Sequence, residues 1–244
     1  MRNILITGTS SGVGKYLAEK LSNQFNVIGI ARRIDKMKQE FKNFKNIYLY
    51  ECDISNFSEL DKTLNKIKNN HGEIYYIINN AGVLKQQSLN SENFFNDLDI
   101  SIAINAIAPI KIINFFIGEM KKLNFGRIIN LTSGAPLNCF PDFGCYSASK
   151  AVLNTLTVTL AKELIDYDIK INLMSPGPVK TEMAPFAPMD ISVCLDTVNY
   201  LLNLKKEDNN YGFYWLGYKV PLFPDLEGVK WLEGIGNEKL IKVL

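Results

Sequence analysis

The chain has 244 residues, of which 47% are hydrophobic and 21% charged, and its formal net charge is +2. This length suits one α/β domain or two small ones, with a sizeable buried core. The balanced charge excludes a bulk electrostatic attraction to nucleic acid or membranes. There is no signal peptide pattern at the N-terminus, and no run of about 18 apolar residues predicts a membrane span. We therefore expect a cytoplasmic protein.

The single histidine and the four cysteines form no CxxC pair and no metal-ligand spacing. We expect no metal site, and reduced structural thiols at Cys52, Cys139, Cys145 and Cys194. His71 precedes a glycine at an expected helix end, so we interpret it as a C-terminal capping residue.

The first 25 residues have the order strand, glycine-rich turn, helix. Residues 2–7 are apolar, TGTSSGVG follows, and apolar residues recur at helical spacing across residues 13–25. In this geometry the free N–H groups and positive dipole end of the helix bind the pyrophosphate of a dinucleotide. Gly8 allows the tight turn, Gly12 the close approach of the pyrophosphate, and Gly14 the close packing of the helix.

The next two strands predict which dinucleotide binds. Residues 26–31 form the second strand, which ends without a carboxylate and is followed by Arg32 and Arg33. NAD sites place a carboxylate there for the ribose hydroxyls, whereas arginines favour the 2′-phosphate of NADP. The alternative is that both arginines are merely solvated. A third strand at residues 46–51 precedes Asp53, which we expect to accept a hydrogen bond from the adenine amino group.

Strands and helices continue to alternate to the end of the domain. This order predicts a single-domain α/β fold, a Rossmann-type doubly wound parallel sheet of about seven strands with helices on both faces. We assign residues 1–221 to this domain and residues 222–244 to a C-terminal tail. Helix 101–120 is apolar nearly all round, so we expect it to meet a second subunit. The further helices are expected at 57–70, 101–120, 144–166 and 190–204, and the strands at 73–79, 127–132, 170–175 and 212–216.

A candidate catalytic pair lies on the helix at residues 144–166. Tyr146 and Lys150 are four residues apart, so they share one helix face and the ammonium can lie near the phenol. A neighbouring cation lowers the phenol pKa from its ordinary value of ~10 toward the range useful for acid–base catalysis. Ser133, at the end of an apolar strand, could bind the same carbonyl oxygen as Tyr146. Asn105 is a polar residue in an apolar helix and needs a partner or a bound water.

With these residues, the chain resembles the short-chain dehydrogenase/reductase family in its compact branch, from residue 2 to about residue 221. TGTSSGVG matches the family fingerprint TGxxxGxG. NNAG at residues 79–82 matches the segment that supports the central strand, and PGPVKT at residues 176–181 matches the loop that holds the nicotinamide carboxamide. The family's catalytic set of Asn, Ser, Tyr and Lys is present in order as Asn105, Ser133, Tyr146 and Lys150.

The resemblance implies reversible hydride transfer between a nicotinamide and a carbonyl or alcohol carbon. Arg32 and Arg33 predict that NADP(H) is preferred over NAD(H). Tyr146 would protonate the carbonyl oxygen, and Ser133 would hydrogen-bond it. Lys150 would lower the pKa of the tyrosine and hold the nicotinamide ribose, and Asn105 would anchor a water in a proton relay. The implied cofactor-binding residues are Gly8, Ser10, Ser11, Gly12, Val13, Gly14, Arg32, Arg33, Asp53, Ile54, Asn80, Ala81, Gly82, Tyr146, Lys150, Pro176, Gly177, Val179 and Thr181.

The substrate, the physiological direction and the choice between homodimer and homotetramer stay open. Two alternatives to a carbonyl or 3-oxoacyl-type reductase are an NADP-binding redox-sensing or scaffold protein with little turnover, and a nucleotide-sugar epimerase or dehydratase. Only residues 182–189 separate PGPVKT from the next helix, which puts a deep lid over the site in doubt. Apolar candidates for the pocket wall favour a small-molecule ketone or aldehyde with hydrocarbon or aromatic parts: Leu84, Leu137, Phe140, Phe143, Met183, Pro185 and Phe186.

Overall fold

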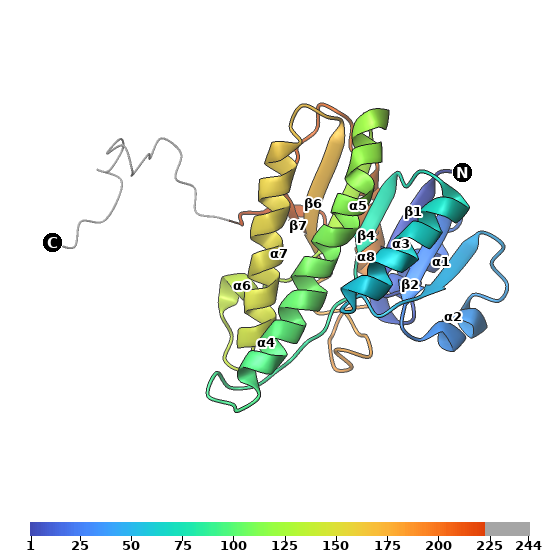
Figure 1. Cartoon of the computed structure of the whole chain (residues 1–244). Helices are drawn as coiled ribbons and strands as arrows, with labels where there is room; N and C mark the ends of the chain where they lie inside the picture. Colours follow the sequence, from blue (N-terminus) through green and yellow to red (C-terminus); the bar gives the residue numbers. More distant parts are fainter. Residues whose placement is uncertain (223–244) are drawn as a thin grey trace, which may run out of the picture.

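Figure 1 shows the computed structural model of the chain, which describes residues 1–222. Of the predicted tail, all but Leu222 lies outside the described residues. The strands are β1 (Asn3–Thr7), β2 (Asn26–Ala31), β3 (Ile47–Glu51), β4 (Tyr76–Asn79), β5 (Gly126–Leu131), β6 (Ile169–Ser175), β7 (Phe213–Trp215) and β8 (Tyr218–Val220). The helices are α1 (Gly12–Leu21), α2 (Ile34–Glu40), α3 (Phe57–His71), α4 (Phe94–Ile102), α5 (Ala108–Leu123), α6 (Ala135–Asn138), α7 (Gly144–Glu163) and α8 (Cys194–Leu202), with a π-helical turn η1 (Ala103–Ile107) and a 3₁₀ turn η2 (Ile191–Val193).

The strands form one sheet in the order β3-β2-β1-β4-β5-β6-β7-β8. All neighbours are parallel except β7 and β8. The predicted doubly wound α/β fold is therefore confirmed, but the sheet has one more strand than expected, and that strand is antiparallel. Leu216 and Gly217 both have positive φ, and two such residues form the tight turn that joins an antiparallel hairpin.

Each face of the sheet carries its own hydrophobic core. On one face, α1 and α8 bury Leu17 and Val198 against the strands. On the other, α3, α5 and α7 lie side by side (Figure 1), with Leu64 and Phe116 in the core beneath them. The strands are buried on both sides, which explains why they are continuous apolar runs in the sequence. The chain reverses its winding between β1 and β4, and ligands bind at such a switch point, at the carboxyl ends of the strands.

The apolar helix α4–η1–α5 is longer than predicted, because it starts at Phe94. By length and composition alone, the stretch Phe94–Leu123 could cross a membrane, with mean hydropathy 1.9 in its most apolar window. The expectation that no stretch passes this test is therefore wrong. Half of that window is buried inside the protein, and Ile112, Ile113 and Phe116 pack in the core under α5. Core helices pass the same test, so this packing accounts for the composition.

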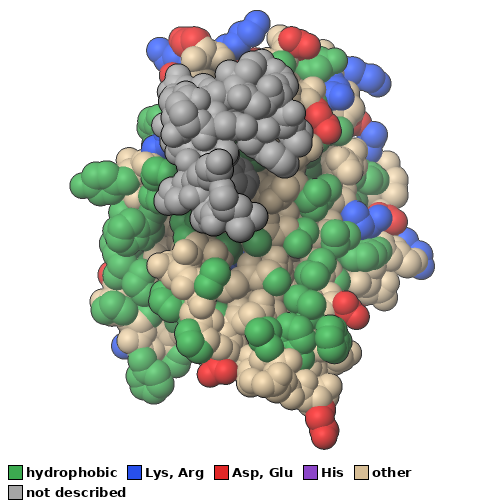
Figure 2. All heavy atoms as spheres, turned by 90° about the vertical axis from the view of Figure 1, so that its left-hand side faces the viewer, with side chains coloured by type: hydrophobic (Ala, Val, Ile, Leu, Met, Phe, Trp, Pro, Cys, Tyr) green, Lys and Arg blue, Asp and Glu red, His purple; other side chains and the backbone are tan. Residues whose placement is uncertain are grey.

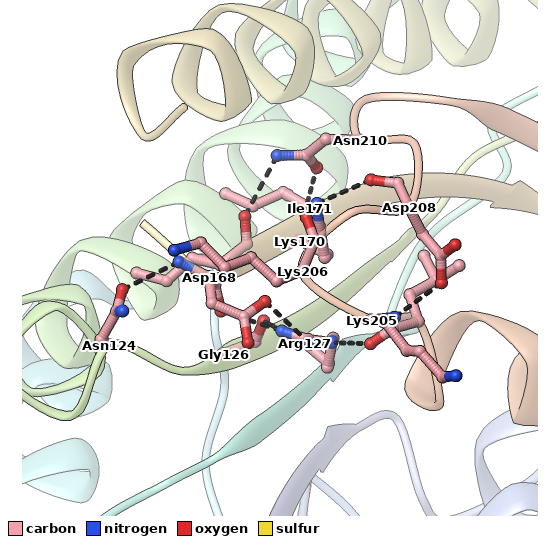
Figure 3. A network of polar contacts seen from close by, with 12 residues as sticks. Asn124, Gly126, Arg127, Asp168, Lys170, Ile171, Lys205, Lys206, Asp208 and Asn210 are labelled. Atoms are coloured by element: carbon pink, nitrogen blue, oxygen red, sulfur yellow. Dashed lines mark hydrogen bonds and ion pairs between the residues drawn. The ribbon is translucent and has the colours of Figure 1, made fainter. Parts of the chain in front are cut away.

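A polar network at the amino ends of β5 and β6 holds the segment that leads into β7 (Figure 3). Arg127 is 3% exposed, and its Nε donates to the backbone oxygen of Leu204 at 2.7 Å. The Lys170 ammonium donates to the backbone oxygens of Lys206 and Asp208, both at 2.6 Å. These bonds satisfy buried cations at the end of the sheet opposite the switch point. We assign the network a structural role, which is to place β7 beside β6.

Of the histidine and the four cysteines, only Cys52 borders the cavity at the switch point. The backbone of Gly72, not the ring of His71, ends α3, because Gly72 has positive φ and its N–H binds the Lys68 oxygen. The His71 ring instead lies 2.8 Å from the Tyr50 hydroxyl. All four cysteines are free, and only Cys139 is exposed.

Candidate active site

A cavity of about 880 Å³ lies at the carboxyl ends of the central strands. Its walls come from the segments that follow six strands, β1 to β6, from α7 and from the β7–β8 hairpin. Volumes of this size are typical of small-molecule and cofactor sites. The cavity runs from Arg32, Arg33 and Asp53 at one end, past the glycine-rich turn, to Tyr146 and Ser133 at the other.

The glycine-rich turn is held against β4 by contacts that exclude larger residues. Gly8 and Gly12 have φ of +77° and +55°, which other residues rarely adopt. A Cβ on Gly14 would lie 2.3 Å from the Asn80 Nδ2 and 2.4 Å from the Gly8 oxygen. The Thr7 hydroxyl accepts hydrogen bonds from the N–H groups of Asn80 and of the residue after it. Gly14 therefore does not line the cavity, but it allows α1 to pack closely against the glycine-rich turn.

The residues present fit a dinucleotide. The first turn of α1 has no acidic residue, so the N-terminal end of its dipole faces the cavity uncompensated. Hydroxyls of Ser10 and Ser11 and the backbone of Gly8 and Gly12 border this end. An anion of the pyrophosphate class matches that donor set.

The two predicted arginines point to different partners. The Arg33 guanidinium binds the hydroxyls of Ser10 and Ser11, with Nε at 3.1 Å and one terminal nitrogen at 2.7 Å, respectively. Arg32 lies 3.9 Å from the Asp53 carboxylate and is mostly exposed. Burial opposes ionisation of Asp53, but hydrogen bonds from a neighbouring serine and the charge of Arg32 prevail and lower its pKa. Arg33 is thus the arginine beside the glycine-rich turn, whereas Arg32 borders the expected adenine end.

Tyr146 and Lys150 lie one turn apart at the start of α7, and both line the cavity. The Lys150 Nζ is 5.9 Å from the centre of the Tyr146 ring and donates to the Leu131 backbone oxygen at 2.7 Å. Burial lowers the pKa of Lys150 to about 8. The ammonium is therefore held mainly by a backbone carbonyl.

The expected lowering of the tyrosine pKa does not occur in this structure. Burial raises the pKa of the Tyr146 phenol, and the Ser133 hydroxyl offsets this only in part. The physical reason is that the Lys150 amine points at Leu131 and not at the phenol oxygen, so loss of hydration dominates. The phenol is thus a proton donor at neutral pH.

Ser133 and Asn105 lie at different depths relative to the cavity. Ser133 lines the cavity, and its oxygen accepts a hydrogen bond from the Ala135 N–H at 3.1 Å, which leaves the hydroxyl proton free to donate. Asn105 is fully buried in η1, behind the cavity wall. Its amide group exchanges hydrogen bonds with the backbone N–H and oxygen of Val83 and donates to the Ser149 hydroxyl. Its side chain therefore ties the segment after β4 to α7, and its predicted role in holding a water stays a prediction.

The substrate end of the cavity is mostly apolar. Met183 and four of the other predicted wall residues line it, but Pro185 and Phe186 do not, and Phe186 is 98% exposed. Phe213, Trp215 and Val220 of the β7–β8 hairpin complete the wall.

Trp215 and Glu182 are two of the cavity residues that were not predicted from the sequence. The Trp215 Nε1 would lie 2.6 Å from a Cβ on Gly177, and the Glu182 carboxylate binds Arg33 at 2.9 Å. The aromatic run Phe213–Trp215 indicated a strand, but no local pattern placed it or Glu182 at the site.

Apart from Gly14 and Asn105, the structure places every predicted catalytic and cofactor-binding residue at this cavity. The predicted residues that line it are Gly8, Ser10, Ser11, Gly12, Val13, Arg32, Arg33, Asp53, Ile54, Asn80, Ala81, Gly82, Ser133, Tyr146, Lys150, Pro176, Gly177, Val179 and Thr181, together with Leu84, Leu137, Phe140, Phe143 and Met183.

The sequence profile described as short chain dehydrogenase matches residues 2–190 of the chain. The chain belongs to the short-chain dehydrogenase family. Benzil reductase ((S)-benzoin forming) of Bacillus cereus, a curated relative, is 30% identical over 199 residues, which cover 75% of this chain and 78% of that enzyme. The solved structure of ElxO with NADP bound is 25% identical with a TM-score of 0.79, over 88% of this chain and 96% of ElxO.

Other family relatives are longer than this chain. An uncharacterized oxidoreductase of Mycobacterium tuberculosis is 28% identical over 189 residues. The match covers 74% of this chain and 55% of that protein, so the chain spans about half the length of the mycobacterial relatives it matches.

Proposed function

We propose that this chain is an NADPH-dependent reductase of ketones or aldehydes, which runs in reverse as an alcohol dehydrogenase. The observation that carries the proposal is the convergence of Ser133, Tyr146 and Lys150 on one cavity that also holds the glycine-rich turn. The redox-sensing or scaffold alternative, without turnover, is an outcome of the test below. A cytoplasmic location is part of the proposal.

The residues at the apolar end supply the proton and hold the substrate oxygen. When bound, the nicotinamide supplies the hydride that adds to the carbonyl carbon. Tyr146 donates its phenolic proton to the carbonyl oxygen, so the product is an alcohol and the phenol becomes a tyrosinate. Ser133 donates its free hydroxyl proton to the same oxygen and stabilises negative charge that develops there. Lys150, whose Nζ lies 5.9 Å from the centre of the Tyr146 ring and donates its hydrogen bond to Leu131, offers the tyrosinate a charge attraction but no hydrogen bond until solvent returns a proton.

The wall of the substrate end favours an apolar, aromatic substrate. Phe140, Phe143 and Trp215 line it, and the charged side chains of the described cavity wall other than Lys150 are Arg32, Arg33, Asp53 and Glu182, which pair with one another. Such a surface binds hydrocarbon and aromatic groups and leaves a sugar's hydroxyls unpaired. The name of the Bacillus cereus relative is consistent with this class, and aryl ketones and diketones are the first substrates to test.

The preference for NADPH follows from the charge at the adenosine end. Arg33 binds the hydroxyls of Ser10 and Ser11, Lys36 shares the Glu182 carboxylate with Arg33, and β2 ends without a carboxylate that would repel a 2′-phosphate. A guanidinium and two hydroxyls suit a phosphate group. The NADP bound to ElxO supports the same assignment. We expect catalytic efficiency with NADPH to exceed that with NADH by roughly tenfold or more, because charge-assisted hydrogen bonds contribute about 1.5 to 3 kcal/mol each.

The test is consumption of NADPH and NADH with a panel of carbonyl compounds, including benzil, by wild type and by Tyr146→Phe. We expect Tyr146→Phe to lose at least about 99% of kcat and to bind NADPH within about threefold of wild type, since only the proton donor is removed. Tyr200→Phe, an exposed tyrosine on α8, is the matched control and should keep full activity.

Two results would overturn the proposal. Tight NADPH binding without consumption across the panel would favour a sensor or scaffold. Activity of Tyr146→Phe within a few fold of wild type would remove the phenol from the mechanism.

A further inference from the structure

An ion-paired bridge crosses the cofactor end of the cavity. Arg33 and Lys36 follow β2, whereas Glu182 follows β6, and the Glu182 carboxylate binds both cations. Glu182 and Arg33 both line the cavity. Beside them, the Thr181 methyl would lie 3.3 Å from a Cβ on Gly12, so this loop rests on the glycine-rich turn. We call Glu182, Arg33 and Lys36 the Glu182 bridge.

The bridge occupies the donors that an external anion would use. The Arg33 guanidinium donates a hydrogen bond from Nε to Ser10, one from a terminal nitrogen to Ser11, and one from the other terminal nitrogen to a Glu182 oxygen. Lys36 binds the second oxygen of the same carboxylate. Hydrogen bonds from Lys36 and Arg33 lower the pKa of Glu182 to about 2, so the carboxylate stays ionised at any working pH. A carboxylate therefore holds the position where two cations and two hydroxyls form an anion site.

The neighbouring acidic side chains pair with other cations. Asp53 lies nearest Arg32, Asp35 pairs with Lys38, and Glu40 pairs with Lys15. Among the described ion pairs, Glu182 is the acid that reaches Arg33 and Lys36. It does so from a loop that also carries three residues of the cavity wall, Met183, Ala184 and Ala187.

We propose that Glu182 is a built-in competitor for the 2′-phosphate of NADP(H), which displaces it from Arg33 and Lys36 and so frees the loop at residues 181–187. This inference rests on the proposed use of NADPH. Two anions cannot share these cations without repulsion, so binding of the phosphate releases the carboxylate. NADH has no 2′-phosphate and leaves the bridge intact. The bridge thus lowers the affinity for NADPH selectively and couples phosphate binding to the mobility of the substrate wall.

The exposure of the Glu182 bridge to solvent limits how much Glu182 can lower the affinity for the phosphate. Side chains of Arg33 and Glu182 are about half exposed, so water and salt weaken each ion pair. Removal of the competing charge should tighten phosphate binding by roughly three- to thirtyfold. The gain should shrink as ionic strength rises.

The first experiment measures binding of two nucleotides that differ by one phosphate. Adenosine 2′,5′-bisphosphate and adenosine 5′-monophosphate are titrated into wild type, Glu182→Gln and Glu40→Gln by calorimetry. We expect Glu182→Gln to bind the bisphosphate roughly three- to thirtyfold more tightly and the monophosphate within about twofold of wild type. Glu40→Gln makes the same charge change beside Lys15, away from Arg33, and should leave both affinities within about twofold.

The second experiment follows the loop itself by hydrogen exchange of residues 181–187. In wild type the bisphosphate should speed exchange there and the monophosphate should not. Glu182→Gln should exchange fast without ligand. This readout does not depend on turnover.

The outcomes separate the two proposals. If wild type binds both nucleotides equally, NADPH preference fails and the inference fails with it. If wild type prefers the bisphosphate but Glu182→Gln gains no affinity, or gains equally for both nucleotides, the competition is overturned while NADPH preference stands. Slower loop exchange in the presence of the bisphosphate would also overturn it.

Discussion

The side chain of Lys150 is almost completely buried in the wall of the cavity. It is 4% exposed, and burial lowers its pKa to about 8 from an ordinary 10.5. Its hydrogen bond to the Leu131 oxygen satisfies one of three donors. The buried amine therefore lowers the stability of the folded protein. Such destabilising groups are typical of residues that take part in catalysis.

This cost predicts a pH dependence of stability. Between pH 8 and 10.5 the unfolded chain binds a proton at Lys150 that the folded chain has lost, so the free energy of unfolding rises with pH across this window. Lys150→Met removes the group. We expect the difference in free energy of unfolding between wild type and variant to move by up to about 3 kcal/mol in favour of wild type between pH ~7 and 10.5.

Urea denaturation at the two pH values measures this difference. Lys62→Met changes an exposed lysine on α3 and should follow wild type across the window. Parallel curves for wild type and Lys150→Met would contradict the assignment of Lys150 as a buried cation.

At the scale of an element, α1 depends on a glycine that no other residue can replace. A Cβ on Gly14 would meet the Gly8 oxygen at 2.4 Å, and that oxygen belongs to the backbone of the turn. Gly14→Ala should therefore displace α1 and destabilise the protein by about 2 kcal/mol or more, and weaken dinucleotide binding. Thermal unfolding and calorimetry with NADPH measure the two effects.

A matched change in α5 should have the opposite sign. Gly118 lies inside that helix, and a Cβ added there would have no described neighbour within 4 Å, so Gly118→Ala relieves only the entropic cost of glycine. We expect a gain of about 0.5 to 1 kcal/mol. Equal effects of the two substitutions would show that crowding around Gly14 does not decide its role.

At the scale of the whole molecule, the surface of α7 predicts self-association. Ala148, Ala151, Thr155 and Thr159 are exposed at helical spacing along one side of the helix. Figure 2 shows hydrophobic side chains spread over the described part of the molecule's face on the left of Figure 1, the side on which α6 and α7 lie. Small residues let two helices approach closely, and an apolar face favours burial. We expect a homodimer or homotetramer in which α5 and α7 pair with their copies.

Light scattering at micromolar concentration tests the assembly. Ala151→Arg should shift the mass toward the monomer, because a charged side chain would enter the helix pair. Asn65→Arg adds the same charge on α3 and should leave the mass unchanged. A monomeric wild type would refute the predicted assembly.

Local patterns determined most of the architecture and the reacting residues. Apolar runs fully buried in a parallel sheet and helices with one apolar face leave a periodic signal, so the alternation of elements was readable. Tyr146 and Lys150 share a helix face by spacing alone, and the glycine-rich turn is a short contiguous segment. The short strand β8 and helix α6 were missed because segments this short give too little periodicity.

Only the tertiary structure decided how distant residues meet. Glu182 reaches Arg33 across 149 positions of sequence, and Trp215 reaches the cavity because β7 pairs with β6. The direction of the Lys150 amine, toward Leu131 and not the phenol, depends on the packing of α7 against β5. Spacing along one helix constrains which side chains share a face. It cannot constrain a contact whose partners lie on different elements, because the relative placement of those elements results from the packing of the whole core.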